Sequence, residues 1–156
     1  MKKILVATIA ALLLSGPVPV RTAGDEARRQ EILGDPTVIY RKTDLSVAAP
    51  LETWEQVLDN LPLMGQLWQR YKFLPAYRVT RTESTLHVVD PTGIVADILP
   101  SARSAGSREY FARGRFDHWA VPSFFTADGV VVFTYRAEGE RIAGELEIFL
   151  QGNNGI

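Results

Sequence analysis

The sequence predicts an α+β domain in which one strand and two consecutive helices precede a curved antiparallel sheet of about six strands. Apolar residues recur at helical spacing between residues 50 and 74. From residue 76 onward they alternate with polar residues at a spacing of two, and turn residues separate the alternating segments. Because the helical and strand patterns occupy separate parts of the chain, antiparallel pairing of the strands is expected.

The first 24 residues are expected to be a signal peptide. Lys2 and Lys3 precede an apolar run, ILVATIAALLL, and SGPVPV then interrupts any helix. The run is shorter than the roughly 20 apolar residues that span a bilayer. Small residues at positions 22 and 24 predict cleavage after Gly24, with an uncleaved anchor as the alternative. Residues 25–156 then form one domain, and the lysine-led signal predicts the bacterial periplasm.

Charge and cysteine content argue against several classes of function. Removing residues 1–24 leaves 14 basic and 18 acidic residues, and this negative balance argues against nucleic acid as a partner. The chain has no cysteine, which excludes disulfides, thiolate catalysis and cysteine-ligated metal clusters. It also excludes a lipid attached to cysteine, so no stable membrane anchor is expected once the signal is removed.

The elements before residue 50 are expected from local residue types. Residues 25–35 are charged and end at Gly34, with Pro36 just beyond, which is typical of a short helix. Residues 37–44 are rich in β-branched and aromatic side chains and are expected to form the first strand.

Two consecutive helices are expected between residues 50 and 74. Pro50 and Pro62 each suit the first turn of a helix, and an apolar stripe at helical spacing follows each of them. The chain is therefore expected to turn a sharp corner at residues 60–62.

The remaining strands are expected between turn signals. Residues 90–93 (DPTG) suit a type I turn, and residues 127–129 and 138–140 are expected to be further turns. Residues 101–107 contain small residues and arginine and are expected to form a solvated connector. Strands are expected within residues 76–82, 85–99 (two strands), 108–116, 130–139 and 141–151.

This order of elements resembles the START-like, helix-grip (SRPBCC) superfamily. The resemblance rests on VIYRKTDLSVAAPLETWEQVLDNLP, as a first strand followed by two helices, and on VVVFTYRAEGERIAGELEIFL, as a late hairpin. It covers roughly residues 37 to 150 and implies a hydrophobic ligand held between the sheet and a long C-terminal helix. The chain ends in QGNNGI after the last expected strand, so that helix is either truncated or absent. A cystatin- or NTF2-like curved sheet and a lipocalin-like barrel are the alternative folds.

Aromatic residues give the main indication of function. Rings fall on both faces of the expected strands, which predicts a sheet that is covered or curled around a cavity. A filled core is the alternative, because each ring buries a large apolar area. The residues expected to line the pocket are Trp54, Trp68, Tyr110, Phe116, Trp119, Phe133 and Tyr135.

Arginines are the candidates for a polar end of this pocket. Arg113 or Arg115 is expected at its mouth, since a guanidinium can hold a carboxylate or phosphate in a bidentate manner. The alternative is ordinary cross-strand pairing with Glu109, Glu145 or Glu147.

The segment FDHWAVPSFF, residues 116–125, combines four rings with His118 and a proline that interrupts a strand. If it is a strand, Asp117 points away from His118 and cannot orient its imidazole. The segment is therefore expected to be a pocket wall or an edge flap. His87 is expected on a polar strand face, and neither GxSxG, HExxH nor GxGxxG occurs in the sequence.

The sequence thus predicts an exported domain that binds a hydrophobic or amphipathic small molecule, such as a lipid, without cofactor, metal or covalent catalysis. One alternative is an enzyme that uses His118 or Asp97 as an acid or base. The other is a protein-interaction module with a solid core and an exposed apolar patch near residues 119–125.

Overall fold

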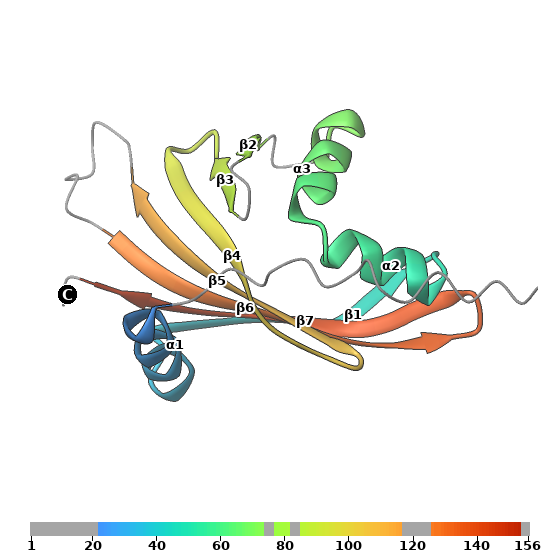
Figure 1. Ribbon diagram of the computed structural model, residues 1–156, viewed down its shortest axis with the longest axis horizontal. Helices are drawn as coiled ribbons and strands as arrows, with labels where there is room; N and C mark the ends of the chain where they lie inside the picture. Colours follow the sequence, from blue (N-terminus) through green and yellow to red (C-terminus); the bar gives the residue numbers. More distant parts are fainter. Residues whose placement is uncertain (1–21, 74–76, 82–84, 117–125, 154–156) are drawn as a thin grey trace, which may run out of the picture.

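The protein forms one antiparallel sheet with helices on both of its faces (Figure 1). The computed structural model describes residues 22–73, 77–81, 85–116 and 126–153. The α+β class expected from the sequence is confirmed. In chain order the elements are α1 (Ala23–Gly34), β1 (Val38–Val47), α2 (Leu51–Leu58), α3 (Leu61–Arg70), β2 (Arg78–Arg81), β3 (Leu86–Val89), β4 (Ile94–Ser104), β5 (Ser107–Phe116), β6 (Thr126–Glu138) and β7 (Arg141–Gly152).

The strands follow the order β1-β7-β6-β5-β4-β3-β2. Each strand from β2 to β7 pairs with its sequence neighbours, so this part of the sheet is the expected meander. The sheet has seven strands instead of about six, because β1 pairs with β7 along its length, from Val38 opposite Leu150 to Val47 opposite Ile142. The long strand β1 and the short strand β2 are the two edges.

Residues 101–107 are not the solvated connector that was expected. Ser101 belongs to β4, is buried, and donates its hydroxyl hydrogen to Glu109 Oε1 at 2.5 Å. Only Ala105 and Gly106 form the turn between β4 and β5. Gly106 has φ 72°, and a Cβ there would lie 2.7 Å from the carbonyl oxygen of Tyr135, so a tight glycine turn replaces a loop.

Residues 127–129 are likewise not a turn. They lie within β6 and pair with both β5 and β7. Asp128 is buried there and accepts a hydrogen bond from Arg28 Nε at 2.9 Å. This long-range partner lets an aspartate occupy a strand interior, where local propensity disfavours it. The expected turn at residues 138–140 is confirmed between β6 and β7.

The two faces of the sheet carry separate cores. On one face, here called the α1 face, Ile32 packs on Phe111 and Val130. On the opposite face, the α2/α3 face, Leu58 and Leu61 pack on strand residues. Figure 1 shows α1 below the sheet and α2 and α3 above it. Rings on both faces of the strands are thus explained by helices on both faces.

Helix α1 is joined to the sheet by arginine–carboxylate pairs as well as apolar contacts. Arg28 pairs with Asp128, and Arg29 pairs with Glu109 at 2.7 Å between Nη2 and Oε2. Asp25 pairs with Arg113 of β5. A hydrogen bond from the Thr22 hydroxyl, together with Arg113, lowers the pKa of the Asp25 carboxyl. α1 is therefore an integral part of the fold.

The expected cleavage site after Gly24 lies inside α1. Thr22 is the N-cap of this helix and forms a capping box with Asp25. Cleavage after Gly24 would remove that cap and the first two residues of the helix. Residues 1–21 lie outside the described part of the chain, and the signal peptide stays a prediction.

Candidate functional site

Four of the residues expected to line a pocket come together on the α2/α3 face. Trp54 of α2 lies edge-on to Phe133 and Tyr135 of β6, with ring centroids 6.1 and 6.2 Å apart. Tyr110 of β5 lies edge-on to Phe133 at 6.2 Å. We call these four residues the inner cluster. The helical spacing of α2 and the alternation of β5 and β6 place them on facing surfaces.

The inner cluster fills the space between α2 and the sheet. Tyr110 and Tyr135 are 4% and 5% exposed, and Leu58, Met64 and Ile142 pack around the rings. T-shaped ring pairs of this kind contribute to core packing beyond the area they bury. Trp54 Nε1 is buried without a hydrogen-bond partner within the described residues.

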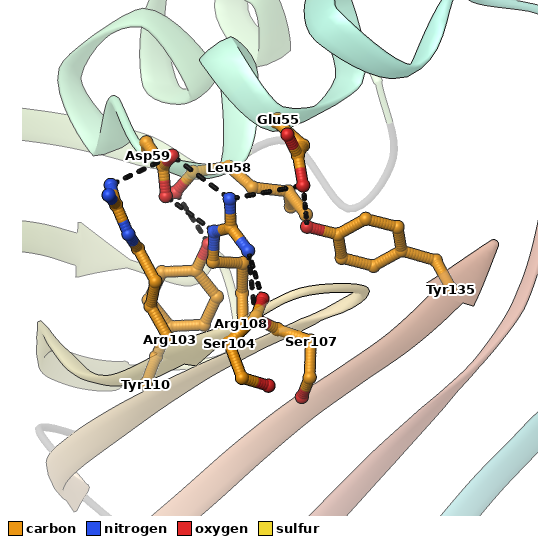
Figure 2. A network of polar contacts seen from close by, with 9 residues as sticks. All are labelled: Glu55, Leu58, Asp59, Arg103, Ser104, Ser107, Arg108, Tyr110 and Tyr135. Atoms are coloured by element: carbon orange, nitrogen blue, oxygen red, sulfur yellow. Dashed lines mark hydrogen bonds and ion pairs between the residues drawn. The ribbon is translucent and has the colours of Figure 1, made fainter. Parts of the chain in front are cut away.

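A polar network borders the inner cluster and is centred on Arg108 (Figure 2). Arg108 is 6% exposed. Its Nε donates to Asp59 Oδ1 at 2.5 Å, and its Nη2 lies 3.3 Å from Glu55 Oε1. Nη1 donates to the carbonyl oxygens of Ser104 and Ser107, both at 2.9 Å. One guanidinium therefore joins the end of α2 to the hairpin of β4 and β5.

The two tyrosines of the inner cluster extend this network. The Tyr110 hydroxyl donates a hydrogen bond to the carbonyl oxygen of Leu58, and the Tyr135 hydroxyl donates one to Glu55 Oε1 at 3.0 Å. Burial raises the pKa of Tyr110. Burial, and then the hydrogen bond to Glu55, raises the pKa of Tyr135 to about 12. Both phenols are neutral donors at ordinary pH, and their hydrogen bonds help to hold α2 against the sheet.

Trp68 lies in a different aromatic group. It contacts Phe73 and Tyr77 with ring centroids 5.5 and 5.3 Å apart, beyond the end of α3. Phe116 ends β5, and its side chain lies outside the described part of the structure, as do His118 and Trp119 in full. The structure therefore brings together four of the seven predicted rings and places Trp68 elsewhere.

The two candidate arginines lie away from the inner cluster. Strand alternation puts Arg113 and Arg115 on the α1 face, opposite Tyr110. Arg113 pairs with Asp25 and lies over the Phe111 ring, with its Cζ 5.4 Å from the ring centroid. Arg115 is exposed. Neither arginine borders the four rings that the sequence placed beside it.

Asp97, the acid of the enzyme alternative, pairs with His87 across β3 and β4. Its Oδ1 lies 2.7 Å from His87 Nδ1, and the aspartate side chain is 52% exposed. This pair lies on the α1 face, on the other side of the sheet from the inner cluster. The turn at residues 90–93 could have revealed it, because residues equidistant from a hairpin turn pair across the strands.

Sequence reasoning missed an apolar surface at the other end of the α2/α3 face. Val38, Tyr40 and Leu150 are 51%, 52% and 39% exposed. Val38 pairs with Leu150, and Tyr40 pairs with Ile148, so all four side chains lie on the same face. We call these four residues the open face. Its signal in the sequence was the alternation of apolar residues in β1 and β7.

The floor of the open face is made of small residues. In β6 and β5, Gly129 and Ala112 continue the row that begins with Val38 and Leu150. A Cβ on Gly129 would lie 2.8 Å from Cδ2 of Leu150, so the leucine side chain lies over the glycine. In Figure 1 none of the helices formed by the described residues lies over this end of the face; α2 and α3 lie toward the other end.

Two hollows lie elsewhere on the molecule. One of about 560 Å³ is lined by strand residues near the bulge in β1, among them Asp44, Arg136, Glu138 and Glu145. Another of about 70 Å³ lies between α3 and strands β2 and β3, beside Gly65. The first is lined with charge and the second is about the size of a few water molecules, so neither suits a hydrophobic ligand.

Comparisons with known proteins do not identify a family. No protein-family model matches the chain, and a search of curated sequences finds no significant match. Among solved structures, an uncharacterised protein from Bacillus thuringiensis is similar over 74% of this chain and 77% of its own, with 14% identity and a TM-score of 0.41. Among the described residues, no helix has the length and apolar character needed to cross a membrane.

Proposed function

We propose that this protein is an exported, periplasmic binding protein for a hydrophobic or amphipathic small molecule, and that the ligand lies on the open face. The observation that carries the proposal is the exposure of Val38, Tyr40 and Leu150 side by side on the uncovered end of a sheet face. A lipid-like acyl or polycyclic compound would bury these side chains at roughly 25 cal/mol for each Å² removed from water.

The architecture supports this location over the inner cluster. The inner cluster already fills the space beneath α2 with its own rings. The open face has the opposite composition, with large apolar side chains around a floor of glycine and alanine. In the START-like resemblance, a hydrophobic ligand lies between the sheet and a covering helix, and here the corresponding face is left accessible.

Native mass spectrometry of protein purified from a bacterial periplasm tests the proposal. We expect a co-purifying amphipathic molecule, or saturable binding of an environment-sensitive fluorescent fatty acid when the protein is isolated empty. The variants Tyr40→Ser and Leu150→Ser should weaken probe binding on the order of tenfold each, by loss of buried apolar area. Leu51→Ser, at a leucine of α2 that is 40% exposed, is the matched control.

Two results would contradict this location. One is unchanged probe affinity in both open-face variants. The other is a loss of affinity in Trp54→Phe that exceeds theirs, since that variant removes only the indole donor and part of the inner ring system. Circular dichroism of each variant separates lost binding from lost folding.

A protein-interaction module is the second candidate, and a separate observation favours it. Val38, Ile39 and Tyr40 are consecutive exposed residues on the edge strand β1. An apolar edge strand with unpaired backbone groups is a template for pairing with another chain. Ile39→Lys places a charge on the α1 face of this edge. It should abolish such pairing, measured by sedimentation velocity, and leave small-molecule binding on the opposite face intact.

A further inference from the structure

The end of α3 presents an exposed group of aromatic rings. Tyr71 and Phe73 are 63% and 50% exposed, and their rings stack with centroids 6.0 Å apart. Trp68 lies edge-on to Phe73, and Tyr77 lies against Trp68 on the other side. We call Trp68, Tyr71, Phe73 and Tyr77 the outer cluster. Phenylalanine is ordinarily among the most buried residues in a folded protein, so its half-exposure here is unusual.

The backbone holds these rings in place. Phe73 N–H donates to the carbonyl oxygen of Trp68 at 3.1 Å, and Lys72 N–H donates to that of Gln69 at 3.3 Å. This is the Schellman arrangement that ends many helices, including the apolar contact between its first and last residues. Trp68 and Phe73 are therefore presented by a defined helix end.

Lys72 occupies an unfavourable conformation within this helix end. Its φ is 53°, and it is the only non-glycine residue with positive φ in the described ranges. Glycine is the usual residue at this position, because a side chain in the left-handed region is strained. A lysine that is kept at a local energetic cost points to a use for its charge.

The surroundings of the outer cluster are basic. Residues 61–81 contain Arg70, Lys72, Arg78 and Arg81 and no acidic residue, although the whole chain has a net charge of −1. Arg70, Lys72 and Arg78 are exposed, and none of the three forms an ion pair within the described part of the chain. Burial raises the pKa of Tyr77, and the negative charge of Asp90 raises it further.

We propose that the outer cluster and its basic residues form a docking surface for anionic lipid bilayers. Tryptophan and tyrosine favour the interfacial region of a bilayer, where a ring can be partly buried while its polar atom stays hydrated. Lysine and arginine beside them are attracted by anionic headgroups. The long side chains of Arg70 and Lys72 can extend to headgroups on either side of the rings.

The contact is peripheral and reversible. The surface is small, because two exposed rings and three basic side chains cover only the end of α3 and the start of β2. So little apolar area enters the bilayer that binding also needs attraction to anionic lipids. This agrees with the expectation of no stable membrane anchor. The proposal does not depend on the ligand proposed for the open face, because no residue is shared between the two surfaces.

Co-sedimentation with vesicles tests this proposal. Exported protein is mixed with vesicles of equal parts phosphatidylglycerol and phosphatidylcholine, or of phosphatidylcholine alone. Protein from the periplasm is used because an attached apolar leader would itself enter the vesicles. We expect binding to the anionic vesicles, little binding to the neutral ones, and release as salt screens the headgroup charge.

Matched double variants locate the surface. Arg70→Gln with Lys72→Gln should weaken binding to anionic vesicles roughly 30-fold, from the attraction of each basic residue to such a surface. Tyr71→Ser with Phe73→Ser should weaken it on the order of tenfold. Arg41→Gln with Arg136→Gln removes the same net charge from exposed positions in the strands, and Leu51→Ser removes an exposed apolar side chain outside both proposed surfaces. Both controls should bind as the parent protein does.

Three outcomes would overturn the proposal. The first is equal binding to neutral and anionic vesicles. The second is an equal loss of binding in the strand controls, which would make net charge the cause and not this surface. The third is binding to a single-stranded oligonucleotide but not to vesicles, which would make the surface a nucleic-acid site. Far-ultraviolet circular dichroism confirms that each variant is folded before it is scored.

Discussion

The inner and outer clusters contain the same kinds of residue in opposite environments. Each holds a tryptophan, a phenylalanine and two tyrosines. In the inner cluster both tyrosines are at most 5% exposed and donate hydrogen bonds to groups of α2. In the outer cluster Tyr71 and Phe73 are at least half exposed, and the basic residues around them lack ion-pair partners among the described residues.

The difference comes from what covers each cluster. α2 closes over the inner rings, and the Arg108 network holds its end against the hairpin of β4 and β5. In the outer cluster, Trp68 lies in the last turn of α3, and Tyr71 and Phe73 lie just beyond it, where both are exposed. Aromatic content alone thus does not separate core from surface, and the comparison predicts different roles for the two clusters.

The largest expected effect is on the stability of the inner cluster. Phe133→Ala removes the ring that contacts both Trp54 and Tyr110 and should lower the free energy of unfolding by about 3 kcal/mol, through lost transfer energy and a cavity. Phe73→Ala in the outer cluster should lower it by less than about 0.5 kcal/mol. Denaturant unfolding followed by circular dichroism measures both, and similar losses would remove the distinction between the clusters.

Arg108 should be the next most sensitive position. Arg108→Met removes the cation beside Glu55 and the nearer of the two cations beside Asp59. We expect a loss of about 2 to 3 kcal/mol in the free energy of unfolding. Arg103, which is 62% exposed and lies 3.4 Å from the same Asp59, is the control. Arg103→Met should cost under about 0.5 kcal/mol. A full-sized loss from Arg103→Met would mean that Asp59 depends on both cations.

Alkaline pH should weaken the inner cluster through Tyr135. Its pKa in the folded protein is raised to about 12, by burial first and by Glu55 second, so the unfolded chain loses this proton at lower pH. The stability that this pKa difference contributes is fully present below about pH 10. It is lost as the pH rises toward 12, which lowers the free energy of unfolding by about 2 kcal/mol. The free energy of unfolding, measured across this pH range, should decline less steeply in Tyr135→Phe than in the parent protein. An equal decline in both proteins would show that the Tyr135 phenol is not its source.

The smallest expected effect is a gain in stability at the outer cluster. Lys72→Gly relieves the left-handed strain at φ 53° and should raise the free energy of unfolding by about 0.5 to 1 kcal/mol, after the entropic cost of glycine. The same variant should bind anionic vesicles more weakly, since a cation is lost. A variant that gained stability and kept full binding would show that Lys72 has no part in docking.

Much of the fold was predictable because it depends on local patterns. Proline positions and helical spacing place α2 and α3 within residues 50–74, and the turns at residues 90–93 and 138–140 separate strands as expected. The connector expected at residues 101–107 was wrong because two contacts stabilise a tight hairpin there, one across the hairpin itself and one with a distant strand. These are the buried bond from Ser101 to Glu109 and the close approach of Gly106 to Tyr135.

The candidate site was predictable only in part. Alternation along residues 108–116 correctly placed Arg113 and Arg115 on one face of their strand and Tyr110 on the other. It could not tell that Tyr110 shares a face with Phe133 and Tyr135, because that depends on the register of β5 and β6. Alternation also could not predict that Arg113 pairs with Asp25, which is 88 residues away in the chain.

The sequence by itself therefore determined the α+β class, the order of the elements and which side chains share a strand face. These follow from periodicity, proline and glycine, and each acts within a few residues. Only the tertiary structure decided which face each helix covers, that α2 buries one aromatic cluster, and that the end of α3 and the open face remain accessible. The physical reason is that burial depends on contacts between elements far apart in the chain. Local periodicity does not specify which of these elements pack together.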